Sequence, residues 1–353
     1  MSLVHGGDVQ GFVDEYGYEP LDFSANVSPL GLPPEVSQAI IDCIPRLAAY
    51  PDPLCRRLTS ALAAHHGVSE DSIICGNGCS DLIFRLAQVL RARRILVCAP
   101  TFAEYATAFG QTQTEVDEYV LSAEDDYVVG EDILDAIQPC HQAVFICQPN
   151  NPTGRTANRD LCRHILEKCS SCGARLVVDE CFIEFIDNPG DITMECFLSD
   201  EHLIILKAFT KLYGMAGLRL GYLLCSDNEL ACRLREAAQP WAVSTVAQAA
   251  GLAALSSEGY VEQLRNLIKD ERTYLKDALA ALGIKAEGEA NFLFFELNGD
   301  AEFCQRMRRQ GVLVRDCSNY SNLKPGCYRV AVRSHGENKK LVQAIAKVLE
   351  EHS

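Results

Sequence analysis

Short apolar runs alternate with amphipathic runs of helical length between residues 70 and 225. The apolar runs, rich in β-branched residues, lie at 72–75, 94–98, 143–147, 175–178, 203–206 and 218–224. Helical patterns separate them, as at 81–91 and 160–172. Strands that alternate with helices predict a mostly parallel sheet with helices on both faces. Ligands bind such sheets beyond the carboxyl ends of the strands, and the unusual residues of this chain gather there.

The pattern changes after Trp241. A long helical stretch at 245–282, interrupted near Gly259, leads to an apolar run at 292–296. We expect a helix at 301–310, strands at 312–315 and 328–332, and a closing helix from residue 337. A chain of 353 residues exceeds what one hydrophobic core usually holds. The predicted parts are an N-terminal arm at 1–30 that joins the small domain, a large α/β domain at 31–240 and a smaller α+β domain at 241–353.

Charge and cysteine usage exclude several classes of protein. The chain has 32 basic and 48 acidic residues, a net charge of −16, which disfavours nucleic acid and anionic membranes as partners. No apolar run approaches the roughly 20 residues that span a bilayer. Most of the 17 cysteines stand in apolar runs and no signal peptide is recognisable, so we expect reduced thiols in a cytoplasmic protein. Cys169 and Cys172 form a CxxC without a second pair or a nearby histidine, so structural thiols are favoured over metal or redox chemistry and no metal is expected.

Residues 76–81 read Gly-Asn-Gly-Cys-Ser-Asp, directly after one predicted strand and at the start of a helix. Free backbone N–H groups and the helix dipole favour an anion such as phosphate at that position. The segment nearly matches the dinucleotide pattern GxGxxG, but Asp81 replaces the third glycine and the next strand lacks the acid that a ribose needs. A phosphate site is therefore favoured over a dinucleotide site, with a plain tight turn as the alternative.

Three further segments follow the ends of predicted strands. The rigid loop at 149–154 presents Asn151. Asp179 closes an apolar strand, where a carboxylate needs a partner such as a protonated ring nitrogen. Lys211 follows the next strand, and Arg219 stands eight residues later. A Schiff-base nucleophile and an arginine for a phosphate dianion explain this pair, whereas a solvated lysine is the alternative for any single lysine.

The motifs occur in a fixed order: Asn151-Pro152-Thr153-Gly154, then Asp179-Glu180, then Thr210-Lys211 followed by Gly217-Leu218-Arg219. Over essentially the whole chain, this set resembles the fold-type I superfamily of class I and II aminotransferases. The resemblance implies the PLP-transferase fold, with a mostly parallel sheet of the seven-stranded type in the large domain, and pyridoxal 5′-phosphate as cofactor. It implies that Lys211 carries the cofactor as a Schiff base and moves protons, that Asp179 pairs with the pyridine nitrogen, and that Asn151 binds the ring oxygen.

The same resemblance assigns further cofactor contacts. Phe102 would stack on the ring, and Tyr50 would reach the cofactor phosphate of the partner subunit, which implies a homodimer. The cofactor phosphate itself would be held by Cys79, Ser80, Thr210 and Arg219. Two residues depart from the family pattern. Phe182 stands where many members have a tyrosine that contacts the ring oxygen, and Ala208 replaces a frequent phosphate-binding hydroxyl.

The arm and the last predicted strands narrow the resemblance. His5-Gly6-Gly7, residues 22–31 with Asn26, residues 314–320 and residues 329–333 resemble threonine-phosphate decarboxylases of cobalamin biosynthesis, as does Phe182. This implies decarboxylation of L-threonine O-3-phosphate to (R)-1-aminopropan-2-yl phosphate. Arg329 would then receive the substrate α-carboxylate. The substrate phosphate would be received by His5, Arg315 and Arg333.

Two alternatives remain open. A histidinol-phosphate aminotransferase shares the fold, the length and the cofactor site, and would transfer the amino group to 2-oxoglutarate. A non-catalytic regulator that binds the cofactor is disfavoured, because no basic or helix-turn-helix segment precedes the fold and Lys211 is intact. In each enzymatic case the expected substrate is a small phosphorylated amino acid or amino alcohol.

Overall fold

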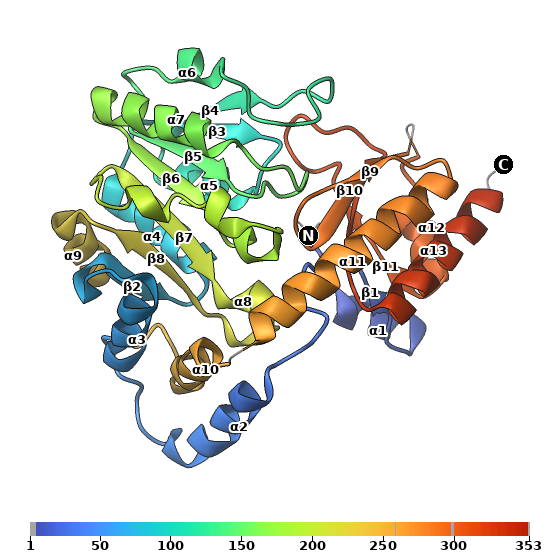
Figure 1. Ribbon diagram of the computed structural model, residues 1–353, viewed down its shortest axis with the longest axis horizontal. Coiled ribbons are helices and arrows are strands. Elements are labelled where there is room, and N and C mark those ends of the chain that lie inside the picture. The colour runs from blue at the N-terminus through green and yellow to red at the C-terminus, as the bar shows by residue number, and fades with distance from the viewer. Residues whose placement is uncertain (1–4, 258, 298–299, 352–353) are drawn as a thin grey trace.

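The computed structural model describes residues 5–257, 259–297 and 300–351 (Figure 1). Seven strands form the larger sheet in the order β2-β8-β7-β6-β5-β3-β4. Their bounds are β2 Ile73–Gly76, β3 Arg94–Ala99, β4 Glu115–Val120, β5 Ala143–Cys147, β6 Arg175–Asp179, β7 Leu203–Ala208 and β8 Gly221–Cys225. Strand β8 runs antiparallel to both of its neighbours, and the remaining pairs are parallel. The predicted mostly parallel sheet is confirmed.

Strand β4 is absent from the sequence prediction. Three of its six residues are acidic, and acidic residues are depleted in strands. It lies at the edge of the sheet beside β3, where acidic side chains can reach water. The predicted start of β8 is also wrong: the strand begins at Gly221 and not at residue 218, because Ala216–Leu218 forms a 3-10 turn and Arg219 adopts a left-handed φ of 55°.

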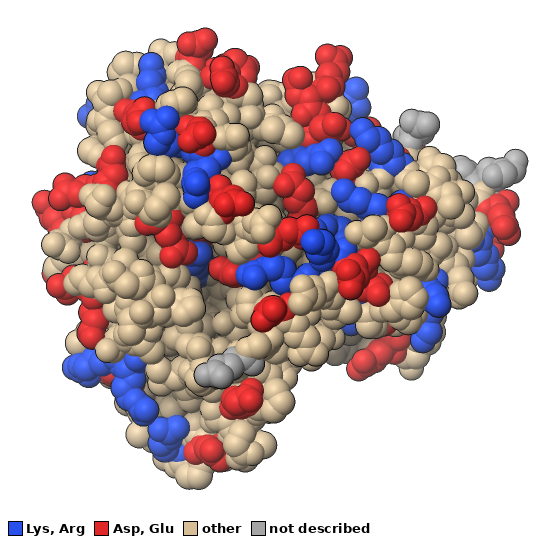
Figure 2. All heavy atoms as spheres, in the orientation of Figure 1, with Lys and Arg blue, Asp and Glu red and all other residues tan. Residues whose placement is uncertain are grey.

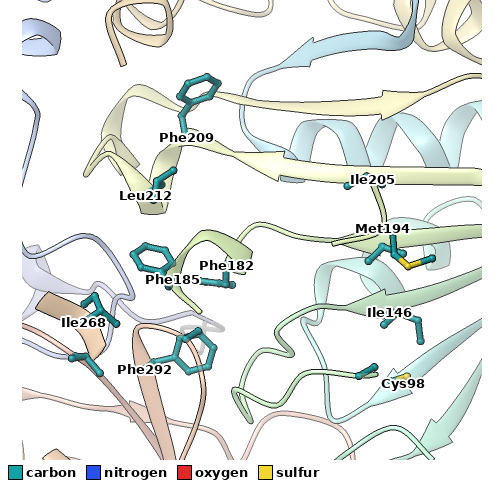
Figure 3. Packing of buried hydrophobic residues seen from close by; sticks show 14 of the residues in the cluster. Cys98, Ile146, Phe182, Phe185, Met194, Ile205, Phe209, Leu212, Ile268 and Phe292 are labelled. Carbon is teal, nitrogen blue, oxygen red and sulfur yellow. The ribbon is translucent and has the colours of Figure 1, made fainter. Parts of the chain in front are cut away.

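Helices cover both faces of the sheet (Figure 1). Those around the larger sheet are α2 Pro34–Cys43, α3 Arg56–His66, α4 Cys79–Leu90, α5 Glu104–Gly110, α6 Ile133–Ala136, α7 Arg159–Cys172, α8 Phe209–Leu212, α9 Asn228–Glu236 and α10 Thr245–Leu255. Successive residues of β5 point to opposite faces, so Phe145 belongs to the core that includes residues of α4, α5 and α9, whereas Ile146 belongs to the core that includes residues of α3 and α7. Figure 3 shows part of the second of these cores, with Cys98 from β3, Ile146 from β5 and Ile205 from β7.

A smaller antiparallel sheet has the order β12-β13-β10-β9. Its strands are β9 Ala286–Glu287, β10 Phe292–Glu296, β12 Arg315–Asp316 and β13 Cys327–Ala331, and its helices are α11 Tyr260–Ala281, α12 Phe303–Arg309 and α13 His335–Glu350. The expected break in the long helical stretch is found, with Gly259 at the N-cap of α11. The single strand predicted at 312–315 is wrong, because β11 (Val312–Leu313) pairs with the arm whereas β12 joins the smaller sheet.

The N-terminal arm crosses to the smaller sheet. It contains α1 (Val9–Tyr16) and β1 (Leu21–Asp22), and β1 pairs in parallel with β11. The backbone N–H of Ala331 donates to the Phe23 carbonyl at 2.8 Å, and the Arg308 guanidinium lies 5.4 Å from the centre of the Phe12 ring. After these contacts, the segment between Phe23 and Val27 lies at the edge of the larger sheet.

The junction between the two sheets is joined by ion pairs along α11. Arg265 contacts Glu184 at 3.0 Å, and Arg272 contacts Asp187 at 2.7 Å. Figure 2 shows interspersed blue and red groups where α11 crosses the molecule. Helix α10 packs on α2 and α3. The division into an arm at 1–30 and domains at 31–240 and 241–353 stays a prediction, and residues 1–4, 258, 298–299 and 352–353 lie outside the described residues.

Within the described ranges, no helix combines the length and the apolar composition that crossing a membrane requires. All 17 cysteines are free thiols, with Cys169 buried and Cys172 half-buried at the end of α7.

Candidate active site

A cavity of about 540 Å³ opens beyond the carboxyl ends of β5, β6 and β7, where parallel strands place ligands. The predicted site residues that line it are His5, Asn26, Cys79, Ser80, Phe102, Asn151, Asp179, Thr210, Lys211, Arg219, Arg315 and Arg329. They come from the arm, from both sheets and from the loops after four strands. Folding therefore brings together residues that are more than 300 positions apart in the sequence.

Two lysines that are four residues apart have opposite electrostatic environments. Lys211 lies in α8, directly after β7, and faces the cavity. Burial lowers the pKa of its amine, with a partial opposing effect of Cys181 and a further lowering by Arg219 and Arg329. The neutral amine, which is the nucleophilic form, is therefore favoured at this position.

Lys207 lies within β7 and is held as a cation. Burial by itself would lower its pKa, but nearby carboxylates outweigh that effect and raise it. Its Nζ lies 3.1 Å from a carboxylate oxygen of Glu180 and 2.5 Å from one of Glu195. An amine that is paired with two carboxylates and has a raised pKa is a poor nucleophile, so the geometry favours Lys211 over Lys207 for the predicted Schiff base.

Asp179 ends β6 with its carboxylate fixed by two donors. Oδ2 accepts a hydrogen bond from the Tyr105 hydroxyl at 2.6 Å, and Oδ1 accepts one from the Cys181 backbone N–H at 3.0 Å. Burial and the Asp179 charge raise the pKa of Tyr105, so this hydroxyl remains a donor. The sequence analysis missed Tyr105. Its position three residues after Phe102 puts the two side chains on the same side of a helical turn, which is the signal that could have identified it.

Arg329 connects three segments at the cavity. Its guanidinium donates to the amide oxygen of Asn151 and, at 2.9 Å, to the carbonyl oxygen of Ser24. With its amide oxygen turned toward the arginine, Asn26 accepts a further bond from Nε at 3.2 Å. The Tyr320 hydroxyl also donates to the Asn151 oxygen, at 3.3 Å. Because this oxygen is engaged, the amide nitrogen of Asn151 is the group that can donate to a ring oxygen of a ligand.

The start of α4 forms a cradle for an anion. Gly78 precedes the helix with φ of 82°, and a Cβ at this position would lie 2.8 Å from a terminal nitrogen of Arg219. The glycine thus lets the guanidinium approach the free N–H groups of the helix N-terminus. Ser80 and Thr210 line the same part of the cavity. The four residues predicted to hold the cofactor phosphate of their own subunit, Cys79, Ser80, Thr210 and Arg219, therefore line one cavity.

Phe102 and Phe182 provide aromatic surfaces. The Phe102 ring packs edge-on against Tyr105 at a centroid distance of 5.6 Å and lies 5.9 Å from the His5 ring. Phe182 packs against Phe292 at 5.1 Å, as Figure 3 shows. A phenylalanine at this position keeps the packing but offers no hydroxyl to a ring oxygen. Ala208 likewise lines the cavity without a hydroxyl group.

Arg315 and Arg329 face the cavity from adjacent strands. They are directly opposite each other in the register of β12 and β13. Arg315 donates to the amide oxygen of Asn319 at 2.7 Å and lies 5.3 Å from the centre of the Tyr320 ring. His5 Nε2 lies 2.8 Å from a carboxylate oxygen of Glu104. The cavity lining thus contains the guanidinium groups of Arg315 and Arg329 and the imidazole of His5, in addition to the guanidinium group of Arg219.

Arg333 and Tyr50 do not line the cavity. Arg333 contacts Glu337 at 2.7 Å and donates to the Asp22 carbonyl at 3.1 Å, so it holds the arm. Tyr50 is 77% exposed and stacks on Trp241 at a centroid distance of 4.1 Å. The predicted roles of both residues stay predictions, and that of Tyr50 concerns the cavity of a second subunit.

The cavity fits the predicted cofactor. It offers an amine with a lowered pKa, a buried carboxylate for a ring nitrogen and an anion cradle, which are the groups that a phosphorylated pyridine aldehyde requires. The fold and this set of groups define an enzyme that acts on amines through a covalently held pyridoxal cofactor.

Comparisons with known proteins agree with this assignment. Residues 18–346 match the family described as aminotransferase class I and II. The chain is 36% identical to a threonine-phosphate decarboxylase of Salmonella typhimurium (strain LT2), over 98% of this chain and 96% of that protein. It is 32% identical to a histidinol-phosphate aminotransferase of Anoxybacillus flavithermus, over 96% of this chain and 91% of that protein.

Among solved structures, this chain is similar to the histidinol-phosphate aminotransferase of Sinorhizobium meliloti in complex with pyridoxal-5′-phosphate. The TM-score is 0.88 at 21% sequence identity, and the match covers 100% of this chain and 96% of that chain. The protein belongs to the aminotransferase class I and II family. It is an enzyme that depends on pyridoxal 5′-phosphate, as the sequence motifs predict.

We expect borohydride reduction of the purified enzyme to attach the cofactor irreversibly to Lys211, because its amine lines the cavity and has a lowered pKa. Peptide mapping by mass spectrometry identifies the labelled residue. Lys207 is the internal control, since it lies in the preceding strand and is paired with carboxylates. A label on Lys207 would contradict the assignment.

Asp179→Ala should lower turnover by about a hundredfold or more, because an interaction of about 3 kcal/mol in the transition state is lost.

Tyr105→Phe removes one of the two donors to Asp179. It should lower turnover about tenfold, because a hydrogen bond to a charged group is worth about 1.5 kcal/mol. Steady-state rates and circular dichroism of both variants provide the measurement. Near-normal turnover of a folded Asp179→Ala enzyme would refute the role of Asp179.

Proposed function

We propose that this enzyme decarboxylates L-threonine O-3-phosphate to (R)-1-aminopropan-2-yl phosphate and carbon dioxide, as a step of cobalamin biosynthesis. The observation that carries the proposal is the pair Arg315 and Arg329, opposite each other on β12 and β13 and facing one cavity. Two guanidinium groups suit a compact substrate with a phosphate and a carboxylate, because each can make charge-assisted hydrogen bonds. The 36% identity to a protein named for this activity supports the choice.

Each anionic group of the substrate has a proposed partner. Arg315 and His5 receive the phosphate, and Arg329 receives the carboxylate. Arg333 contributes through the arm, since its guanidinium holds the Asp22 carbonyl and not the cavity wall. Two fixed ends leave the substrate little freedom to rotate about its amine, so these anchors decide how Cα is presented.

The orientation of Cα decides the reaction. When bound, the cofactor supplies an electron sink for the Cα bond that stands perpendicular to its ring. Asp179 would keep the ring nitrogen protonated, and Lys211, once its amine has taken up a proton, would deliver that proton to Cα. We propose that the two anchors turn the carboxylate bond perpendicular to the ring. Arg329 receives the carboxylate in either reaction, and the orientation makes the difference. If Arg329 held the carboxylate near the ring plane, the Cα–H bond would break and amino transfer would follow.

Amino transfer from histidinol phosphate is the second candidate. Curated proteins of that name match this chain at up to 33% identity over nearly its whole length. Histidinol phosphate carries one anionic group, its phosphate, so the second guanidinium would be used only by the dicarboxylate 2-oxoglutarate in the other half-reaction.

Purified enzyme supplied with L-threonine O-3-phosphate and no keto acid is expected to release carbon dioxide and form 1-aminopropan-2-yl phosphate in equal amounts. Radiometric trapping of carbon dioxide and phosphorus NMR of the product measure the two. The parallel assay supplies histidinol phosphate with 2-oxoglutarate and follows glutamate. Complete conversion in that assay, with no carbon dioxide in the first, would reverse the proposal.

We further propose that two copies of this chain form a dimer. Exposed apolar side chains gather on α2, on the segment that follows it and at Trp241, where α2 protrudes from the molecule in Figure 1. They are Ile41, Ile44, Leu47, Leu54 and Trp241, with Tyr50 among them. Apolar side chains concentrated in this way are typical of an interaction surface. On this arrangement Tyr50 would reach the cofactor site of the partner.

Ile44→Glu should convert the dimer to monomer, because a charge would be buried among apolar groups. Val128→Glu is the matched control, since Val128 is 38% exposed and lies outside the α2 surface. Sedimentation velocity at micromolar concentration gives the mass of each variant. A wild-type monomer with full activity would contradict the proposal.

A further inference from the structure

Two thiols meet at the wall of the active-site cavity. Cys79 is the first residue of α4, and Cys181 lies two residues after the end of β6. Both are half-buried, and both line the cavity. The Cys181 thiol donates to Cys79 Sγ at 3.2 Å, and the Cys79 thiol donates to the Lys207 carbonyl at 3.1 Å. The cofactor chemistry derived above uses neither sulfur atom.

We propose that Cys79 and Cys181 are an oxidation site, and that a small disulfide such as oxidised glutathione converts them into a disulfide that opposes cofactor binding. The two sulfur atoms have to approach from 3.2 Å to about 2.05 Å, a movement of about 1 Å. The cavity gives an oxidant access to both. The disulfide itself rests on these two thiols alone, whereas its effect on the cofactor rests on the cofactor site described above.

The exchange proceeds in two steps that balance. The Cys79 thiolate attacks one sulfur of oxidised glutathione, which forms a mixed disulfide and releases one glutathione thiolate. Cys181 then loses its proton, attacks the Cys79 sulfur and releases the second glutathione. Two protein thiols are oxidised to one disulfide, and one glutathione disulfide is reduced to two thiols that take up the two protons. Cys79 is placed to attack first, because its sulfur atom accepts the hydrogen bond from the Cys181 thiol.

The disulfide would disturb two cofactor contacts at once. Cys79 carries the first backbone N–H of the phosphate cradle, and the Cys181 N–H donates to Asp179 at 3.0 Å. Drawing the two sulfur atoms together strains the start of α4 against the end of β6. Conversely, a cofactor that lies between the cradle and Asp179 shields the thiols from the oxidant. Oxidation and cofactor binding are therefore expected to exclude each other.

Cys147 lines the same cavity but lacks these features. Its thiol donates to the Pro149 carbonyl at 3.4 Å and not to another sulfur atom. It supplies a matched control, because Cys147→Ala removes a cavity thiol without touching the pair.

The test uses full-length enzyme, freed of cofactor or loaded with it, and treated with oxidised glutathione. After the remaining thiols are alkylated, a tryptic digest without reduction should contain peptide 58–85 linked to peptide 176–207. These peptides also contain Cys75 and Cys196, so fragment ions must assign the bond to Cys79 and Cys181. Uptake of pyridoxal 5′-phosphate, followed by its visible absorbance, is the second measurement.

We expect the linked peptide in the cofactor-free enzyme and little of it in the loaded enzyme. The oxidised cofactor-free enzyme should bind the cofactor about tenfold or more weakly, and dithiothreitol should reverse this loss. Cys181→Ala and Cys79→Ala should form no link, and their cofactor uptake should not respond to the oxidant; Cys147→Ala should behave as wild type. The absence of the link while other thiols react would overturn the proposal. A link that leaves cofactor uptake unchanged would overturn its effect on the cofactor. Neither readout depends on which substrate the enzyme takes.

Discussion

The guanidinium group of Arg329 is the interaction on which the arrangement of the cavity depends. A buried arginine must find acceptors, because an unpaired charge removed from water is costly. Its acceptors here are Asn151 on the loop after β5 and the Ser24 carbonyl on the arm, while the arginine itself stands on β13 of the smaller sheet. The need to satisfy one side chain thus fixes three segments around a single space, and the same charge remains available to an anionic substrate.

Charge is also used selectively within this acidic protein. The whole chain has a net charge of −16, whereas the cavity lining includes Arg219, Arg315, Arg329 and His5. Lys207 and Lys211 show how far local surroundings override residue type. One is held as a cation by Glu180 and Glu195, whereas burial and neighbouring arginines favour the neutral form of the other. The first lysine supports the strand, and the second is left free for chemistry.

Most of the architecture follows from local patterns in the sequence. Apolar runs in β3, β5, β6 and β7 predict central strands, because a strand buried on both faces needs apolar residues throughout. The same rule explains why β4 was missed, since an edge strand can carry acidic residues. The split of 312–315 between two sheets was also missed, because the partners of β11 and β12 lie at opposite ends of the chain.

The sequence by itself determined the fold class and the cofactor and predicted the lysine that carries it, because these depend on motifs whose residues are close together and follow strand ends. Only the tertiary structure decided which distant groups meet. Tyr105 at Asp179, Cys181 at Cys79 and Arg315 beside Arg329 are contacts between segments that no local pattern relates. The structure also separated Arg333 from the cavity, because Glu337 one helical turn later and the Asp22 carbonyl take its guanidinium. Local periodicity encodes which face of an element is buried, whereas the packing of the whole chain selects the partner on that face.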